Sequence, residues 1–210
     1  MNIIDVLNYS GSLFLLVKEV QKIVYRKSQK NKIYNSLKSS LDSSTKAYDS
    51  MIYSLYGLLG ANIFASQIMP YNYEIIGKGF ANDFIESYNN LISEIENLVV
   101  HLKSHENSIK EISGKEWIKY ETIFHAFEKE TDWKYLYEEF SKEKISQPKR
   151  KDVSKFINVI YDEIKPVTSQ FDKKWFGDID EFVKIAQDPK TVKKIKKIIF
   201  EENQKKYSGR

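Results

Sequence analysis

Two histidines, His101 and His105, stand four residues apart near the middle of the chain. On a helix this spacing places both imidazole rings on one face, where they can share a metal ion. Glu106 adjoins them, and a third histidine, His125, follows farther along the chain. Carboxylate and imidazole groups of this kind are the parts from which helical bundles build metal sites.

The residues around these histidines do not follow the pattern of a two-metal bundle site. That pattern needs Glu-x-x-His on two helices and a further Glu on each of two others. Here Leu98 stands three residues before His101, and Thr122 stands three residues before His125. We therefore predict no metal and no cofactor, and we keep His101 and His105 as the only candidate ligands. The expected arrangement places His105 at a helix interface and His101 on the surface.

No combination of nucleophile, base or paired carboxylates marks a catalytic site. The acidic residues of 162–163 and 178–181 lie near aromatic residues, but close neighbours on a helix face different directions. The serines of 36–44 lack a nucleophile-elbow motif. We predict no catalytic residue and no enzyme. A pocket lined by several of the 14 tyrosines would leave no motif, so catalysis stays open as an alternative.

Two basic clusters have the charge to attract phosphate groups or an anionic membrane surface. They comprise Lys149, Arg150 and Lys151 in a polar segment with a proline, and Lys193, Lys194, Lys196 and Lys197 on the last expected helix. No nucleic-acid motif accompanies the first cluster, which favours a solvated loop. Glu201 and Glu202 dilute the second, whose helix more simply covers the core with its apolar side.

The element that must hold the rest together is an uncharged stretch at residues 50–73. Gly57, Ala61 and Ala65 recur every four residues within it, which places a row of small side chains on one helix face. Another backbone can approach such a row closely. The stretch is long enough to span a bilayer, but several polar residues dilute it and Pro70 ends it. We expect the buried central helix of a bundle over 50–69, within a longer helix of about 31–68.

A second long helix carries the clearest periodicity in the chain, over 84–112. Its apolar residues alternate spacings of four and three: Phe84, Tyr88, Leu91, Ile95, Leu98 and Leu102. This heptad seam predicts close packing, either on the preceding helix or on a second copy of the chain. An antiparallel intramolecular pair is the simpler expectation, because the connecting loop is short. The seam continues past His105 to Ile112, and Ser113–Gly114 should end the helix.

The remaining segments predict an amphipathic helix over 13–26 and several short helices after residue 114. Among the short ones, 133–140 follows a cap at Thr131 and Asp132, and 153–164 ends before Pro166. Gly11 is expected to interrupt the first helix, and Gly77 and Gly79 to lie in a loop. No strand-like alternation occurs. The predicted fold is all-α: two or three long N-terminal helices followed by several shorter C-terminal ones.

Composition indicates a folded globule without disulfides. The 210 residues are 41% hydrophobic, include no cysteine and carry a formal net charge of +4. Residues 1–113 hold 11 basic and 11 acidic residues, whereas 114–210 hold 22 and 18. We predict a long-helix bundle over 1–113 and a short-helix region over 114–210, packed together as one globule. The N-terminus lacks the pattern of a signal peptide, so we expect a cytoplasmic protein, with recruitment to membrane left open.

These observations favour a non-enzymatic bundle that acts by binding another protein or a second copy of itself. A first alternative is a membrane-perturbing bundle that releases the helix at 50–69 into lipid, with the basic C-terminal helix contacting an anionic membrane first. Leakage from anionic vesicles would discriminate it. A second alternative is a nucleic-acid-associated protein that uses the two basic clusters, whose mark would be steeply salt-dependent binding.

Overall fold

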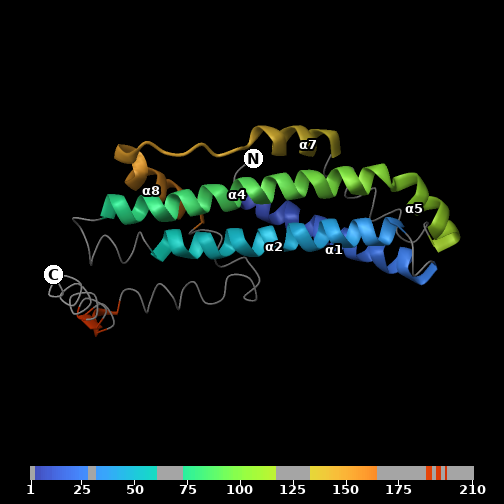
Figure 1. The fold of residues 1–210 in the computed structure, drawn as a ribbon, viewed down its shortest axis with the longest axis horizontal. Helices are drawn as coiled ribbons and strands as arrows, with labels where there is room; N and C mark the ends of the chain where they lie inside the picture. The colour runs from blue at the N-terminus through green and yellow to red at the C-terminus, as the bar shows by residue number, and fades with distance from the viewer. Residues whose placement is uncertain are drawn as a thin grey trace, which may run out of the picture. The chain divides into compact units, whose positions relative to one another are not determined.

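The structure, a computed structural model, describes residues 3–27, 32–60, 73–116, 133–164, 188–190, 193–194 and 197. Within these ranges the chain is helical apart from short segments such as residues 143–149, and it contains no strand (Figure 1). The elements are α1 (Ile3–Lys27), α2 (Lys32–Gly60), α4 (Tyr73–Ser104), α5 (Glu106–Ser113), η2 (Gly114–Glu116), α7 (Trp133–Lys142), η3 (Arg150–Asp152) and α8 (Val153–Ile164). The prediction of an all-α fold with the longer helices first is confirmed.

The chain divides into two compact units, and each unit is assembled from two separate segments. Unit 1 comprises Met1–Met51 and Ile85–Ser146, and unit 2 comprises Ile52–Phe84 and Gln147–Arg210. The helices α2 and α4 therefore each contribute residues to both units. The division at residue 113, drawn from the sequence, stays a prediction.

In unit 1, α1 buries the apolar side that its sequence periodicity predicts. Its fully covered residues recur at spacings of three and four, which is the helical period: Leu13, Leu16, Val17, Val20, Ile23 and Val24. Phe14 contacts Tyr48 of α2 edge to face, with ring centroids 5.8 Å apart. The buried side of α1 thus packs against the first part of α2.

The helices α2 and α4 lie side by side and antiparallel in unit 1. Ser36 Oγ lies 3.0 Å from His101 Nδ1, and Ser44 Oγ lies 2.9 Å from the carbonyl oxygen of Glu94. Residue numbers therefore rise along α2 as they fall along α4. Ser44 is fully buried, and its hydroxyl can donate to the Glu94 carbonyl or to that of Ser40. Small serine side chains let the two backbones approach closely here.

The heptad seam of α4 is buried within the chain. Each of its six residues is at most 1% exposed: Phe84, Tyr88, Leu91, Ile95, Leu98 and Leu102. The expected antiparallel intramolecular packing is therefore observed for these six residues.

The seam helix is not continuous to residue 113 as predicted. It breaks at His105, whose backbone angles of φ −99° and ψ 0° depart from helical values. Backbone hydrogen bonds from His105 N to His101 O and from Ile109 N to His105 O still bridge the break. Beyond it, α5 turns away from the line of α4 (Figure 1) and contacts α1, with Ile109 buried. Gly114, at φ +53°, ends α5 as predicted.

In unit 2, Gly57 and Gly77 mark close contacts with side chains of neighbouring helices. A β-carbon at Gly57 of α2 would lie 2.9 Å from Cδ1 of Phe80 on α4. A β-carbon at Gly77 of α4 would lie 3.0 Å from Cδ1 of Ile157 on α8. The absence of side chains at these two positions therefore gives room to a phenylalanine ring and to an isoleucine. Phe84 and Phe156 extend the packing of α4 and α8, with ring centroids 6.4 Å apart.

Three glycine predictions are wrong. Gly11 lies within α1, and Gly77 and Gly79 lie within α4, where a break or a loop was expected. At Gly77 the close approach of α8 explains the glycine, because a side chain there would meet Ile157. The predicted helix over 31–68 is described as far as Gly60, and residues 61–72 lie outside the described part of the chain.

Candidate functional site

A groove between α4 and α7 is the strongest candidate for a binding site, and both helices belong to unit 1. The helix α7 is amphipathic: Phe140 is buried, whereas Tyr135 and Tyr137 are exposed. Asn89 of α4 fixes the segment that follows α7. Its side-chain amide accepts a hydrogen bond from Ile145 N at 2.9 Å and donates one to Ile145 O at 3.0 Å. These contacts hold α7 and the chain beyond it against α4.

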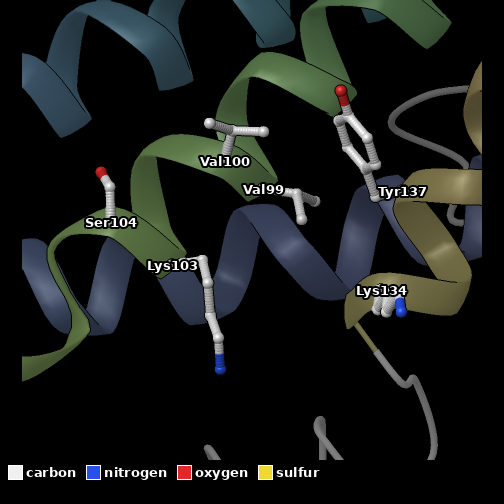
Figure 2. A pocket seen from close by; sticks show the side chains of 6 residues that line it. All are labelled: Val99, Val100, Lys103, Ser104, Lys134 and Tyr137. Atoms are coloured by element: carbon white, nitrogen blue, oxygen red, sulfur yellow. The ribbon is translucent and has the colours of Figure 1, made fainter.

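The groove has apolar walls and a volume of about 400 Å³. The six described residues that line it are Val99, Val100, Lys103 and Ser104 of α4 and Lys134 and Tyr137 of α7. Val99 is buried, whereas Val100 is 47% exposed and Tyr137 is 45% exposed. Figure 2 shows Val99 directed toward the Tyr137 side chain across the hollow. Two half-exposed apolar side chains beside one hollow are costly to leave in water.

Both charged side chains that line the described part of the groove are lysines. In Figure 2 the Lys103 side chain extends toward the bottom of the view, whereas the Tyr137 hydroxyl points toward the top. Lys103 Nζ pairs with Glu106 Oε2 at 2.8 Å, and Lys110 Nζ pairs with Glu106 Oε1 at 2.8 Å. Burial alone would raise the pKa of Glu106, but these two lysines hold it below its ordinary value. Lys103 and Lys110 therefore share the Glu106 carboxylate beside the groove.

A second groove lies between α1 and α2, also in unit 1, with a volume of about 370 Å³. Leu15, which is 67% exposed, and the tilted pair of Tyr25 and Tyr34 supply its apolar surface. Gln21 also lines it, and the side-chain nitrogen of Gln21 is buried with no hydrogen-bond partner. Its charged residues have both signs: Lys18 and Lys22 are basic, and Glu19 is acidic. Lys22 pairs with Glu19 on the same helix. This mixture makes the second groove less selective for one kind of ligand.

Within the described ranges, the two histidine candidates are not brought together with other ligands. His101 is exposed and bonds Ser36, whereas His105 is partly buried at the break between α4 and α5. Among the described residues, no group of three or more histidine, aspartate or glutamate side chains could hold a metal ion. His125 lies outside the described residues.

Of the predicted row of small residues, only Gly57 can be assessed. The Phe80 side chain lies against it within unit 2, and the close approach of another backbone to the row stays a prediction. Ala61 and Ala65 lie outside the described residues. In the part of the chain that the structure describes, no helix is long and apolar enough to cross a membrane.

The residues of the two basic clusters that the structure describes are all exposed. Lys149 precedes η3, which contains Arg150 and Lys151. In the second cluster Lys193, Lys194 and Lys197 are described, whereas Lys196 lies outside the described residues.

Sequence reasoning missed the α4–α7 groove. The signal that marks it is the adjacent pair Val99 and Val100, because neighbouring residues on a helix point in different directions. At least one of the two valines therefore lies outside the seam and faces another element or the solvent. On α7, Tyr135 and Tyr137 lie outside the face that buries Phe140.

Comparisons of the chain with protein-family models, with curated proteins and with solved structures give no match.

Proposed function

We propose that this protein is a non-enzymatic helical bundle that binds another protein, and that the α4–α7 groove is the place of binding. The observation that carries the proposal is the pair of half-exposed apolar residues, Val100 and Tyr137, beside a hollow of about 400 Å³. Interfaces concentrate their binding energy in such hollows, where an apolar or aromatic side chain of the partner is buried. Tyrosine in particular is enriched in such contacts.

The groove supports this proposal better than the seam of α4 does. The seam residues are already covered by the chain itself, so binding through them would require the bundle to open. Val100 and Tyr137 need no such rearrangement, because they are exposed in the folded protein. Binding at a surface that exists before the partner arrives avoids the free energy of unfolding.

A selection from a random peptide library displayed on phage, carried out against the folded full-length chain, tests the proposal. Peptides that bind through the groove should lose binding to Tyr137→Ala and to Val100→Ser. The matched control is Tyr135→Ala, which removes an exposed tyrosine (58% exposed) from the same helix but not from the groove. Binders that tolerate both groove variants, or the absence of any binder, would contradict the proposal.

The partner in this proposal is a second protein or a second copy of the chain. Light scattering coupled to size-exclusion chromatography, over a range of protein concentrations, separates the two. Self-association that Tyr137→Ala abolishes would identify a second copy as the partner. A monomer at every concentration would leave a different protein as the partner.

A further inference from the structure

The residues at the start of α8 form an exposed basic surface in unit 2. We propose that Lys149, Lys151 and Lys155, here called the α8 basic surface, bind the phosphate headgroups of an anionic membrane, and that Val159 of α8 contacts the lipid beside them. This contact lies on the surface of the folded protein and requires no helix to leave the bundle. It goes beyond the proposed function, because the α4–α7 groove belongs to unit 1.

The excess positive charge of the chain belongs to unit 2 rather than to unit 1. Unit 2 holds 17 basic and 12 acidic residues, which gives a formal net charge of +5. Unit 1 holds 16 basic and 17 acidic residues, which gives a formal net charge of −1. A basic surface raises the local concentration of an anionic partner. Such a partner is therefore expected to meet unit 2.

The lysines of the α8 basic surface are available to an anionic partner. All three side chains are exposed, and none of them takes part in an ion pair with any residue that the structure describes. Arg150 stands between Lys149 and Lys151 but has an interaction of its own, and it is left out of the surface for that reason. Asp152 is half-buried, and its backbone N–H donates to the carbonyl oxygen of Lys149 at 2.8 Å. The charges of the three lysines therefore remain for a partner to neutralise.

The packing of α8 on α4 fixes which side of α8 faces outward. Ile157 and Ile160 are buried, and a β-carbon at Gly77 of α4 would lie 3.0 Å from Cδ1 of Ile157. Lys155 and Val159, four residues apart, lie on the other side of α8, where Val159 is 54% exposed. The outward side of α8 therefore carries a lysine and an apolar side chain one turn apart.

A lysine beside an exposed apolar residue suits the surface of an anionic membrane. The ammonium group reaches the headgroup phosphates, while the apolar neighbour enters the boundary with the acyl chains. Each basic residue near such a surface strengthens binding by about fivefold. Asp162 is exposed three residues beyond Val159, so the contact is limited to the first half of α8. Three lysines and one valine therefore give a reversible contact that salt weakens.

Other anionic partners fit the α8 basic surface less well. Single-stranded nucleic acid needs aromatic faces on which its bases stack. The exposed residues one turn after Lys155 are Asn158 and Val159, neither of which is aromatic. A nucleic-acid duplex is bound through its phosphates, and an exposed valine beside the lysines adds nothing to that contact. A protein partner is usually anchored by an apolar residue that enters a hollow, whereas Val159 is itself exposed.

Cosedimentation of the full-length chain with lipid vesicles tests this inference. One set of vesicles is made of phosphatidylcholine alone, and the other set is made of equal parts of phosphatidylcholine and phosphatidylserine. The chain should sediment with the second set and not with the first, and added sodium chloride should release it. A dye enclosed in the same vesicles should stay inside, because the proposed contact is confined to the headgroup region.

Replacing the three lysines of the α8 basic surface should weaken binding to the anionic vesicles by about ten- to hundredfold. This triple variant is Lys149→Gln, Lys151→Gln and Lys155→Gln. The matched control, Lys18→Gln with Lys38→Gln and Lys46→Gln, removes the same charge from exposed positions of α1 and α2 in unit 1. The control should bind much like the wild type. Circular dichroism of each variant establishes that its helices are intact.

The valine of the outward side is tested separately. Val159→Ser should weaken binding to the anionic vesicles by about two- to fivefold, because an apolar contact with lipid is lost. A variant that binds as well as the wild type would overturn the part of the proposal that places Val159 against lipid.

The outcomes separate a membrane contact from the alternatives. No binding to either set of vesicles, equal binding to both, or an equal loss in the two triple variants would overturn the proposal. Release of the enclosed dye would indicate insertion and overturn a contact confined to the headgroups. A short DNA duplex that binds more tightly than the vesicles, and that needs the same three lysines, would assign the surface to nucleic acid instead.

This inference and the proposed function can fail independently. The triple variant of the α8 basic surface should keep its binding to peptides selected for the α4–α7 groove. Tyr137→Ala should lose those peptides and keep its binding to anionic vesicles, because Tyr137 belongs to unit 1. Loss of vesicle binding in Tyr137→Ala would place the membrane contact on unit 1 and overturn the inference.

Discussion

Asn89 uses both polar atoms of its side chain to hold a single residue, Ile145, beside α4. Replacing Asn89 with alanine leaves the backbone N–H and carbonyl of Ile145 without these partners. We expect a loss of about 1–3 kcal/mol in the free energy of unfolding, because polar groups left unpaired in a partly buried place retain their cost of desolvation. Urea denaturation followed by circular dichroism measures this loss.

The neighbouring residue Asn90 provides the control for this substitution. Its side chain is exposed, so Asn90→Ala should change the free energy of unfolding by no more than about 0.5 kcal/mol. Equal effects at the two positions would show that the contacts of Asn89 with Ile145 do not stabilise the fold.

Glu96 of α4 carries a carboxylate oxygen that is buried without a hydrogen-bond partner. Burial raises the pKa of the Glu96 carboxyl above its ordinary value, although the charge of Lys144 acts in the opposite direction. At a pH between the ordinary glutamate pKa and the raised pKa, the Glu96 carboxyl is therefore protonated in the folded state but ionised in the unfolded state. Stability due to Glu96 must then fall as the pH rises from the ordinary glutamate pKa through the raised one.

The substitution Glu96→Gln removes this pH-dependent loss and keeps the shape of the side chain. We expect the variant to unfold at higher urea concentration than the wild type at neutral pH, with the difference shrinking as the pH falls below the ordinary glutamate pKa. Glu86→Gln removes the same charge from an exposed position of α4 and controls for net charge. The pKa of Glu106 is shifted in the opposite direction, below its ordinary value. The stability that Glu106 contributes is therefore lost as the pH falls. A difference for Glu96→Gln that grows toward acid pH would contradict this account.

At the scale of single helices, two glycines of unit 2 differ in what surrounds them. A β-carbon at Gly79 of α4 would meet nothing within 4 Å, whereas one at Gly57 of α2 would lie 2.9 Å from the Phe80 ring. We expect Gly79→Ala to raise the free energy of unfolding by about 0.5–1 kcal/mol, because alanine favours the helix. Gly57→Ala should gain less or lose stability, because the Phe80 ring must move. Thermal and urea unfolding of the two variants compare them, and an equal gain would show that the Phe80 contact costs nothing to displace.

The glycines within α1 and α4 show why the sequence predicts the existence of helices better than the positions of their ends. Apolar spacing predicted α7 and α8 nearly to the residue, because each must bury one side. Glycine was interpreted as a break at Gly11, Gly77 and Gly79, yet all three are helical. The space at Gly77 is used by Ile157, a residue 80 positions away that no local pattern reveals. The break at His105 was missed for a related reason, since α5 turns to pack on α1.

The candidate groove was harder to predict than the fold. Periodicity identifies residues that one helix buries, but a groove needs residues left exposed by two helices that pack together. Val100 and Tyr137 are 37 positions apart in the sequence, and the contact of Asn89 with Ile145 that holds their helices has no local signature. At Gly57 the sequence predicted the approach of another backbone, whereas the nearest atoms belong to the Phe80 side chain, which no local pattern identifies.

At the scale of the whole molecule, neither unit is a continuous piece of chain. Unit 1 needs Ile85–Ser146 as well as the N-terminal segment, so it extends beyond residue 113. The part of unit 1 after residue 113 includes Phe140, which is 1% exposed, and Ile145, which bonds Asn89. Because α2 and α4 contribute to both units, any cut between the two helices separates residues that belong to one compact unit.

A pair of fragments tests whether residues 1–113 form a domain, as the sequence suggested, or whether unit 1 requires residues 114–146. The fragments 1–113 and 1–146 both lack the C-terminal part of unit 2, so they differ only in the segment in question. Burial of one large side chain such as Phe140 contributes about 1.5–3 kcal/mol, and the two hydrogen bonds of Asn89 add to it. We therefore expect 1–113 to be less stable than 1–146 by several kcal/mol.

The comparison is made by urea unfolding, followed by far- and near-ultraviolet circular dichroism. The fragment 1–146 should unfold in one cooperative step with ordered aromatic signals. The fragment 1–113 should retain helix but bind a hydrophobic dye, because the surface of α4 that α7 covers becomes exposed. Asn89→Ala should destabilise 1–146 and leave 1–113 unchanged, since the shorter fragment lacks Ile145. Equal stability of the two fragments would instead establish residues 1–113 as a domain that folds without the segment carrying α7.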